Sequence, residues 1–448
     1  MSPRPALTPR PPLPPPLSPS LGEGEEKRVL RDRVSRWVKI LSAYFTAQTL
    51  TQFLGIAAGL LFINFMPVSE FALYTLAASV ITFFTFVSDL GSTTSLVHFY
   101  QRSAREGGDF QGYLAAVLSL RRGMFLLGGA AVLLALPRAA TARGFGLAES
   151  LAATAGVLVA VWFQISASVR VLALRLEDRY GPSYRAELVG GAVRLAFALA
   201  MVASALLWSW LGVLASALGA AAVALLARPA RAATSRSDLG PYRRDVLRYL
   251  LPTLPSAAYF SVQAPLTVWL AATFGETQNI AEVGALGRLG LVVGLFSGLT
   301  GIVFLPRLAR ILDDRLYLRR ALQFGLLLLA AALALLTVAA AAPRLFLMLL
   351  GPNYSGLDRE LLLVVAGSGL ALLDGYVVSV NLARSWTRWQ GLAVGSLIVA
   401  QAVLVATLPL STTAGVLSFN VLSSAAALAG QLAIAAVGFT RPRWVAWR

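Results

Sequence analysis

About twelve apolar stretches, each roughly 20 residues long, follow one another along this chain, and its charged residues lie almost entirely between them. A stretch of that length crosses the ~30 Å hydrocarbon core of a bilayer as an α-helix that rises ~1.5 Å per residue. Hydrophobic residues make up 57% of the chain and charged residues only 13%, which leaves little polar surface for a water-soluble domain. The pattern predicts an all-α polytopic membrane protein.

The expected spans lie near residues 43–66, 71–98, 116–136, 148–170, 187–207, 209–227, 250–273, 282–305, 321–342, 361–383, 391–409 and 415–438. An even number of spans puts both ends of the chain on the same side of the membrane. Counted by loop, about 32 Lys and Arg residues lie on that side and about 4 on the other, and the positive-inside rule assigns the richer side to the cytoplasm. We therefore expect both termini in the cytoplasm.

The formal net charge of +17 follows largely from this topology, because most basic residues stand beside spans, where they meet anionic lipid headgroups. Membrane lipids are thus expected partners and nucleic acid is not. The chain has no Cys and one His, His98, so disulfides, thiolate metal sites and histidine metal clusters are excluded. Neither lysine, Lys27 or Lys39, has the glycine spacing of a Walker phosphate loop, which excludes ATP hydrolysis by that route.

Composition divides the chain into five parts. Residues 1–40 are expected to form a disordered Pro-rich tail and a basic helix on the cytoplasmic membrane surface. Residues 41–227 form an N-lobe, 228–248 a basic cytoplasmic linker, 249–440 a C-lobe and 441–448 a cytoplasmic tail. Each lobe holds six spans, and the second span of each opens similarly, at Glu70 and at Glu282. Two six-helix lobes related by a pseudo-twofold repeat, with a site between them, are a common plan of transporters.

Four short segments, taken in order, resemble one family of membrane proteins. They read NFMPVSEFALY at residues 64–74, SDLG at 88–91, FLPRL at 304–308 and LLGPNY at 349–354. With their spacing across the spans, they are similar to the Wzx-like polysaccharide flippases of the multidrug/oligosaccharidyl-lipid/polysaccharide (MOP) superfamily. The chain departs from that pattern at Asn64, where such proteins often carry a basic residue, and at Ala285 and Leu286, which leaves the identity of the cargo open.

The resemblance implies a MATE-like fold in the bacterial inner membrane. It implies a transporter that flips a polyprenyl-diphosphate-linked oligosaccharide from the inner to the outer leaflet by alternating access. A polysaccharide polymerase and glycosyltransferases are the implied functional partners, and no cofactor is implied. Without a Walker phosphate loop, transport would be driven by an ion gradient such as H⁺ or Na⁺, by the membrane potential or by downstream consumption of the cargo. A peptidoglycan-precursor flippase and a cation-coupled multidrug exporter of the same superfamily are the alternatives.

A membrane-embedded polymerase or glycosyltransferase is the competing class of protein. Such an enzyme needs carboxylates or arginines gathered on an outer loop. The expected outer loops are short and offer few such groups, among them Glu149, Asp358 and Glu360. We therefore expect movement of cargo, no catalytic residues and no metal ligands.

Two arginines lie inside the expected spans, where a charge normally faces a cavity or a partner. Arg288 lies ~9 Å into the eighth span from outside, and Arg194 lies ~12 Å from the inner end of the fifth. A guanidinium group in a cavity can bind a phosphate with two hydrogen bonds. Both arginines are therefore candidate substrate-binding residues. The alternatives are that Arg288 reaches the outer headgroups or pairs with Glu276 or Glu282, and that Arg194 pairs with Glu187 or Asp89.

Two aspartates also lie inside the expected spans, and we assign them to ion coupling or gating. Asp374, ~20 Å from the outer end of the tenth span, is the better candidate for H⁺ or Na⁺ coupling; pairing with an Arg across the lobe interface is its alternative. Asp89 lies near the inner end of the second span. A structural or gating role is the favoured interpretation for Asp89, and ion coupling is the other.

Amides and prolines complete the candidate residues. Gln48 and Gln52 lie one turn apart on the first span and are candidates to bond sugar hydroxyls, although such amides more often bridge neighbouring helices. Pro252, Pro255 and Pro265 lie in the seventh span. Proline removes a backbone donor, and broken helices are tolerated where they line cavities, so this span is the expected hinge; a static kink is the alternative.

Overall fold

The computed structural model describes residues 49–106, 109–227, 239–251, 254–299, 308, 311, 313–384, 386 and 388–441. The expected Pro-rich tail and surface helix, Gln48, Pro252 and most of the expected C-terminal tail lie outside these residues. The chain divides into two compact units, Met1–Leu50 and Thr51–Arg448. The contacts given below all lie within the second unit.

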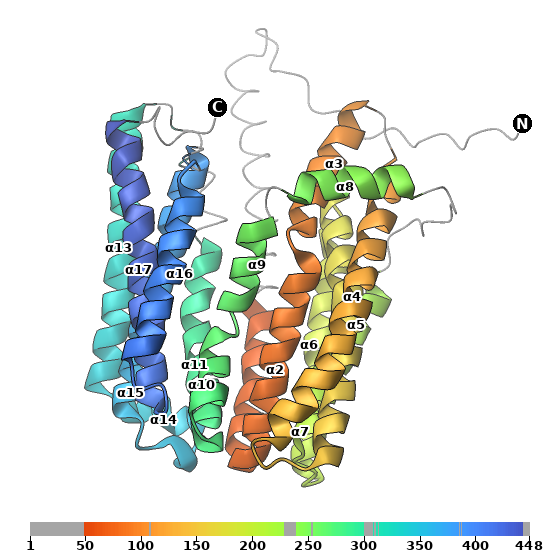
Figure 1. Cartoon of the computed structure of the whole chain (residues 1–448), viewed down its shortest axis with the longest axis vertical. Helices are drawn as coiled ribbons and strands as arrows, with labels where there is room; N and C mark the ends of the chain where they lie inside the picture. Colours follow the sequence, from red (N-terminus) through yellow and green to blue (C-terminus); the bar gives the residue numbers. More distant parts are fainter. Residues whose placement is uncertain are drawn as a thin grey trace, which may run out of the picture. The chain divides into compact units, whose positions relative to one another are not determined.

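Helices make up nearly all of the described residues, and no strand occurs among them. The N-terminal half holds the helix Thr49–Phe65, α2 (Val68–Asp89), α3 (Ser92–Glu106), α4 (Phe110–Thr141), α5 (Leu147–Leu176), α6 (Tyr180–Ala203) and α7 (Ser209–Leu226). The C-terminal half holds α8 (Gly240–Leu250), α9 (Leu254–Gln263), α10 (Leu266–Phe274), α11 (Thr277–Leu299), α13 (Asp314–Ala341), α14 (Pro343–Leu350), the 3₁₀ turn η3 (Pro352–Tyr354), α15 (Asp358–Ala383), α16 (Gln390–Thr407) and α17 (Thr413–Thr440) (Figure 1).

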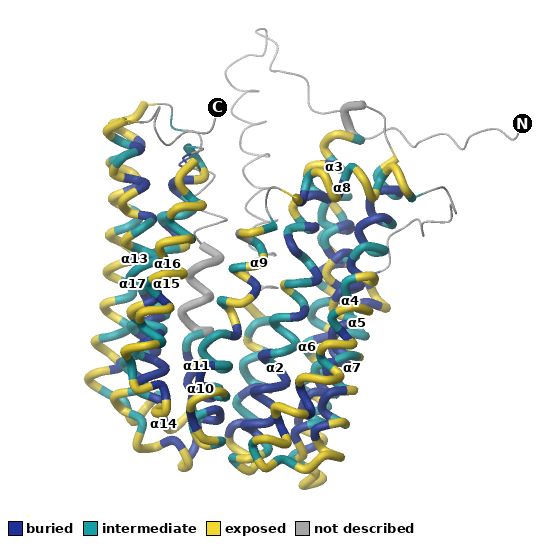
Figure 2. The backbone as a smooth tube through the Cα atoms, in the orientation of Figure 1, coloured by how far each residue is buried: buried dark blue, intermediate teal, exposed yellow. Residues whose placement is uncertain are grey.

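Nine helices of the described residues are long and apolar enough to cross a membrane. Together with Thr49–Phe65, the pair α9 and α10, and α11, they account for every span expected from the sequence. Large apolar side chains such as Leu126, Leu127 and Leu326 are exposed on these helices, which suits contact with lipid tails. Exposed positions recur along helices such as α13 (Figure 2). The expected all-α polytopic fold is confirmed.

Helices pack mainly within their own half of the chain. In the N-lobe α5 lies against α4 and α7, and α6 against α7; in the C-lobe α15 lies against α13 and α17, and α16 against α17. The lobes meet along α2, which packs against α10 and α11. One cluster of buried apolar residues spans both lobes, from Phe71 in α2 to Val283 in α11 and Leu350 in α14.

The second expected span is bent near its end. It was expected as one helix over 71–98, but α2 ends at Asp89 and α3 begins at Ser92. The two residues between them have positive φ angles, 37° at Leu90 and 83° at Gly91, which interrupt the helix. Asp89 accepts a hydrogen bond from the backbone N–H of Thr93 (3.0 Å), so the second helix begins against its carboxylate.

The seventh expected span is broken where its prolines indicated. α9 ends at Gln263 and α10 begins at Leu266, so the interruption falls at Ala264 and Pro265. Pro265 is buried and Pro255, in the first turn of α9, is exposed. The break itself is observed; whether it bends during a transport cycle stays a prediction.

The described part of the expected linker is helical. Helix α8 lies across the ends of α3 and α4 (Figure 1). Its apolar side, with Val246 and Leu250, packs into a cluster with Phe99 and Tyr113. The Tyr113 hydroxyl donates to the carboxylate of Asp245 (3.1 Å), which fixes the helix on the N-lobe. We call this end of the bundle the α8 end.

Three contacts join the lobes at the opposite end, where α14 lies. Asn64 donates from Nδ2 to the Leu349 carbonyl (2.8 Å), Phe71 meets Tyr354 edge to face with ring centroids 6.5 Å apart, and Arg143 donates to the Gly275 carbonyl. Burial, and secondarily Glu282, raise the pKa of Tyr354 to about 12, so its hydroxyl stays protonated at neutral pH. We call these six residues the lobe seal: Asn64, Phe71, Arg143, Gly275, Leu349 and Tyr354.

Candidate functional site

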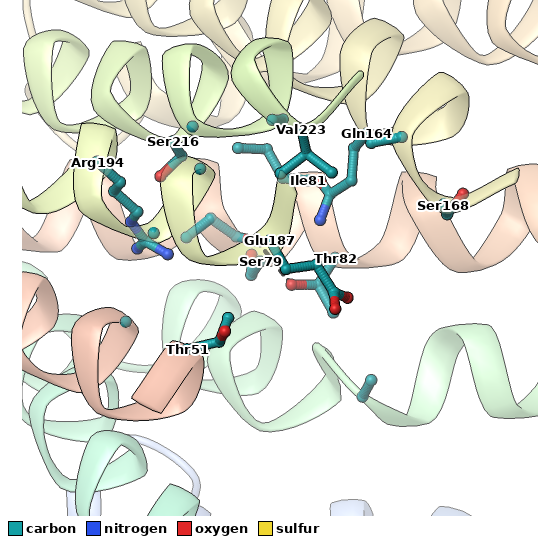
Figure 3. A pocket seen from close by; sticks show the side chains of 18 of the residues that line it. Thr51, Ser79, Ile81, Thr82, Gln164, Ser168, Glu187, Arg194, Ser216 and Val223 are labelled. Carbon is teal, nitrogen blue, oxygen red and sulfur yellow. Dashed lines mark hydrogen bonds between the residues drawn. The ribbon is translucent and has the colours of Figure 1, made fainter. Parts of the chain in front are cut away.

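A cavity of about 790 Å³ lies between the lobes. Its lining begins at Tyr74 in the second turn of α2 and continues to Thr93 in α3 and Arg175 at the end of α5, so it extends from the middle of the bundle toward the α8 end. Figure 3 shows Arg194 and Gln164 pointing into this space from different helices. The lobe seal closes the α14 end.

Both candidate arginines line this cavity and converge on one hydroxyl group. Arg194 of α6 donates to Tyr74 Oη (3.0 Å), and Arg288 of α11 reaches the same oxygen at 3.5 Å. The Arg288 guanidinium also lies over the Tyr74 ring, 5.9 Å from its centroid. Three helices from both lobes therefore meet at one cationic site.

Local packing explains why the two guanidinium groups can come so close. Tyr74 is 1% exposed and is held edge to face against Phe62, with ring centroids 5.0 Å apart. The Arg288 side chain lies against Gly59 of the first helix, where an added Cβ would lie 3.5 Å from its Cδ, at ordinary van der Waals distance. The arginine positions are thus set by neighbours that are themselves fixed.

The arrangement is suited to binding an anion. A phenol oxygen is neutral, so neither arginine's charge is cancelled by it. The Nε of Arg194 is buried and has no hydrogen-bond partner among the described residues. Two guanidinium groups with donors to spare fit the oxygens of a phosphate or diphosphate.

Three of the four carboxylates considered as partners for these arginines are engaged elsewhere. Glu187 accepts from Arg175 (2.7 Å), Asp89 pairs with Arg121, and Glu282 accepts from Thr413 and Gln278. Glu187 and Arg175 do line the cavity, toward its α8 end.

Arg121 is an intramembrane charge that the sequence analysis missed. It is 2% exposed and pairs with Asp89, while Ser92 and Ser168 accept further hydrogen bonds from its guanidinium group (2.7 and 2.8 Å). It had been counted with the inner loops although it falls within the span expected at 116–136. The pair joins the α2–α3 bend to α4, which fits a structural role for Asp89.

Asp374 lies apart from the arginines, in the C-lobe. Its Oδ1 is buried without a hydrogen-bond partner among the described residues. Elsewhere in the C-lobe, the Tyr259 hydroxyl lies 3.3 Å from Oε1 of Gln401, and Gln401 donates to Gln263 (2.8 Å) and to Ser423 (2.6 Å). We call these four residues the C-lobe polar cluster: Tyr259, Gln263, Gln401 and Ser423.

No family model and no curated protein sequence matches this chain. Solved structures do. The inward-facing form of a multidrug resistance MATE family transporter of the MOP superfamily is 15% identical, covers 87% of this chain and 96% of its own, and gives a TM-score of 0.60. The lipid II flippase MurJ, in an inward closed conformation, is 12% identical, covers 88% of this chain and 86% of its own, and gives a TM-score of 0.68. The chain has a MATE-like fold. A third structure, MATE in complex with MaD3S, is 16% identical, covers 88% of this chain and 94% of its own, and gives a TM-score of 0.50.

The remaining candidate residues can be placed on the MATE-like fold. Pro265 lines the cavity at the helix break. Gln52 is half-buried on the first helix and does not line the cavity, whereas its neighbour Thr51 does. Gln164 and Thr82 also line it and had not been singled out from the sequence. The rule that identified Arg194 and Arg288, that a polar group inside an apolar span faces a cavity or a partner, could also have identified Gln164, because its amide lies in the middle of such a span.

Among the described residues no three His, Cys, Asp or Glu side chains come together as a metal site would require. The C-lobe polar cluster gathers hydroxyl and amide oxygens, which are hard donors.

Proposed function

We propose that this protein is a transporter that flips a polyprenyl-diphosphate-linked oligosaccharide from the inner to the outer leaflet by alternating access. The observation that carries the proposal is the convergence of Arg194 and Arg288 on Tyr74 inside a cavity between two lobes. The MATE-like fold supports it, since the solved proteins that share the fold are named as transporters and a flippase.

The chemistry of this cargo matches the site. A diphosphate needs cationic donors where water is scarce, and the two arginines supply them from opposite lobes. The sugars would occupy the polar cavity while the polyprenyl chain stays in the bilayer with the membrane lipids. The basic α8 end would face the cytoplasm of the bacterial inner membrane with both termini, as the loop charges indicate. Glycosyltransferases would supply the cargo and a polysaccharide polymerase would consume it.

A peptidoglycan-precursor flippase is the second candidate. The specific observation in its favour is the likeness to the lipid II flippase MurJ over 88% of this chain. A cation-coupled multidrug exporter fits less well, because an organic cation would meet Arg194 and Arg288 in the cavity without a free carboxylate beside them.

We further propose that H⁺ or Na⁺ couples to transport at Asp374. A buried carboxylate oxygen without a partner gains stability from a proton or a cation, and Asp374 Oδ1 is such an oxygen. Flipping rates should then rise with an imposed H⁺ or Na⁺ gradient, and Asp374→Asn should abolish that response. A gradient response that persists in Asp374→Asn places the coupling elsewhere.

The flippase proposal is tested with purified protein in liposomes that contain a fluorescent polyprenyl-diphosphate oligosaccharide. Wild-type protein should move it between leaflets. Arg288→Ala and Arg194→Ala should each slow it about tenfold or more, because a charge-assisted bond to phosphate is lost. Arg344→Ala, which removes an exposed arginine outside the cavity, is the control. If the protein expels organic cations and ignores the lipid-linked sugar, the proposal fails.

A further inference from the structure

The two walls of the cavity differ in chemistry. The N-lobe wall carries hydroxyl and amide side chains, including Thr51, Thr82 and Gln164 (Figure 3). The described C-lobe wall, apart from Arg288, carries apolar or small residues, among them Pro265 and Val268. A sugar ring has hydroxyl groups on its edge and C–H groups on its face. Its hydroxyl groups would match the N-lobe wall and its C–H face the C-lobe wall.

Hydrogen-bonding capacity on the N-lobe wall is only partly used. Gln164 accepts at Oε1 from the Thr85 hydroxyl (3.3 Å), and its amide nitrogen has no recorded partner among the described residues. Thr82 donates to the Ala78 carbonyl of its own helix (2.9 Å), so its oxygen can still accept. The wall therefore offers free donors and free acceptors side by side, which suits a group that both donates and accepts, as a hydroxyl does.

Charge on this part of the cavity is already balanced. Glu187 is the acidic residue on the described lining, and it is paired with Arg175 (2.7 Å). Arg194 and Arg288 lie deeper, around Tyr74. A sugar carboxylate beside Gln164 would have no unpaired cation as partner, and Glu187 would repel it.

We propose that Thr51, Thr82 and Gln164 form a subsite for an uncharged, hydroxyl-rich sugar of the cargo, with its apolar face against Pro265 and Val268. This assignment rests on the proposed flippase function, in which Arg194 and Arg288 hold the diphosphate. It adds that the sugars nearest the diphosphate are neutral, so uronic acids are excluded from that position.

The test compares three fluorescent polyprenyl-diphosphate lipids in liposomes with full-length protein: one bearing a neutral hexose disaccharide, one in which the first hexose is replaced by its uronic acid, and one without sugar. Wild-type protein should flip the neutral glycan about tenfold faster than the uronate, because the negative charge of the uronate would lie near Glu187 without a free cation to pair with. Gln164→Leu should slow the neutral glycan about threefold to tenfold and leave the sugar-free lipid unchanged, because only hydrogen bonds to sugar are lost.

Gln323→Leu is the matched control, because Gln323 is exposed on α13 and does not line the cavity. Flipping of both glycans at one rate, with Gln164→Leu equal to wild type, would overturn the sugar subsite and leave the flippase proposal standing. If wild-type protein moves none of the three lipids, the proposed function itself fails. Faster flipping of the uronate would also overturn the assignment of a neutral sugar.

Discussion

At the scale of single residues, the Tyr74 hydroxyl orients Arg194 and Arg288. We expect Tyr74→Phe to slow flipping of a polyprenyl-diphosphate oligosaccharide about threefold to tenfold, because two guanidinium groups lose their shared acceptor. Initial rates in liposomes measure the effect. Tyr317→Phe is the control, since it removes another fully buried hydroxyl, one that donates to the Val380 carbonyl and lies outside the cavity lining. Equal rates for Tyr74→Phe and wild type would contradict a positioning role.

The same residues show how far sequence reasoning reaches at this scale. Arg194 and Arg288 could be found because a charge inside an apolar span is rare and needs a partner. Their partner could not, since Tyr74 is one of 12 tyrosines and its neighbours are set by packing between helices far apart in the sequence. Arg121 was missed because the count of basic residues by loop placed it in an inner loop. It lies inside α4, where it pairs with Asp89.

At the scale of helices, the Asp89–Arg121 pair should hold the α2–α3 bend against α4. We expect Asp89→Asn to lower the free energy of unfolding by about 3 kcal/mol, because it leaves the buried Arg121 charge unpaired. Denaturation in detergent micelles measures it. Combining Asp89→Asn with Arg121→Met should restore much of the loss. Asp314→Asn, which changes an exposed carboxylate paired with the partly exposed Arg384, should cost at most about 1 kcal/mol. A double variant no more stable than Asp89→Asn would contradict the pairing.

Element positions followed closely from hydropathy, because an uninterrupted apolar run has one stable form in lipid. The break between α9 and α10 was also foreseeable, since Pro265 cannot donate a backbone hydrogen bond. The bend after Asp89 was not, because a single Gly91 in a polar motif does not reveal a positive φ at Leu90. Helix α8 was expected as a basic linker. In the structure Val246 and Leu250 of α8 pack against Tyr113 of α4, and this contact depends on where α3 and α4 lie, which the sequence does not give.

At the scale of the whole molecule, the cavity extends toward the α8 end while the lobe seal closes the α14 end. Alternating access requires that this seal open and that α2 separate from α11. Two of the segments that carried the family resemblance, 64–74 and 349–354, contact each other in the seal through Asn64 and Leu349. Their pairing across the lobes gives those short motifs a physical reason: they join the surfaces that would separate in the proposed transport cycle.

A disulfide across the lobes should therefore block transport, and the chain's lack of cysteine makes the experiment clean. A Cβ at Gly284 of α11 would lie 3.0 Å from the Thr75 Cβ of α2, slightly nearer than the ~3.8 Å usual for a disulfide. We expect oxidised Thr75→Cys/Gly284→Cys protein to stop flipping and to recover when reduced. Ala393→Cys/Gly430→Cys, with Cβ atoms 3.7 Å apart within the C-lobe, should flip equally in both redox states. If the oxidised cross-lobe variant keeps flipping, separation of α2 from α11 is not part of the cycle.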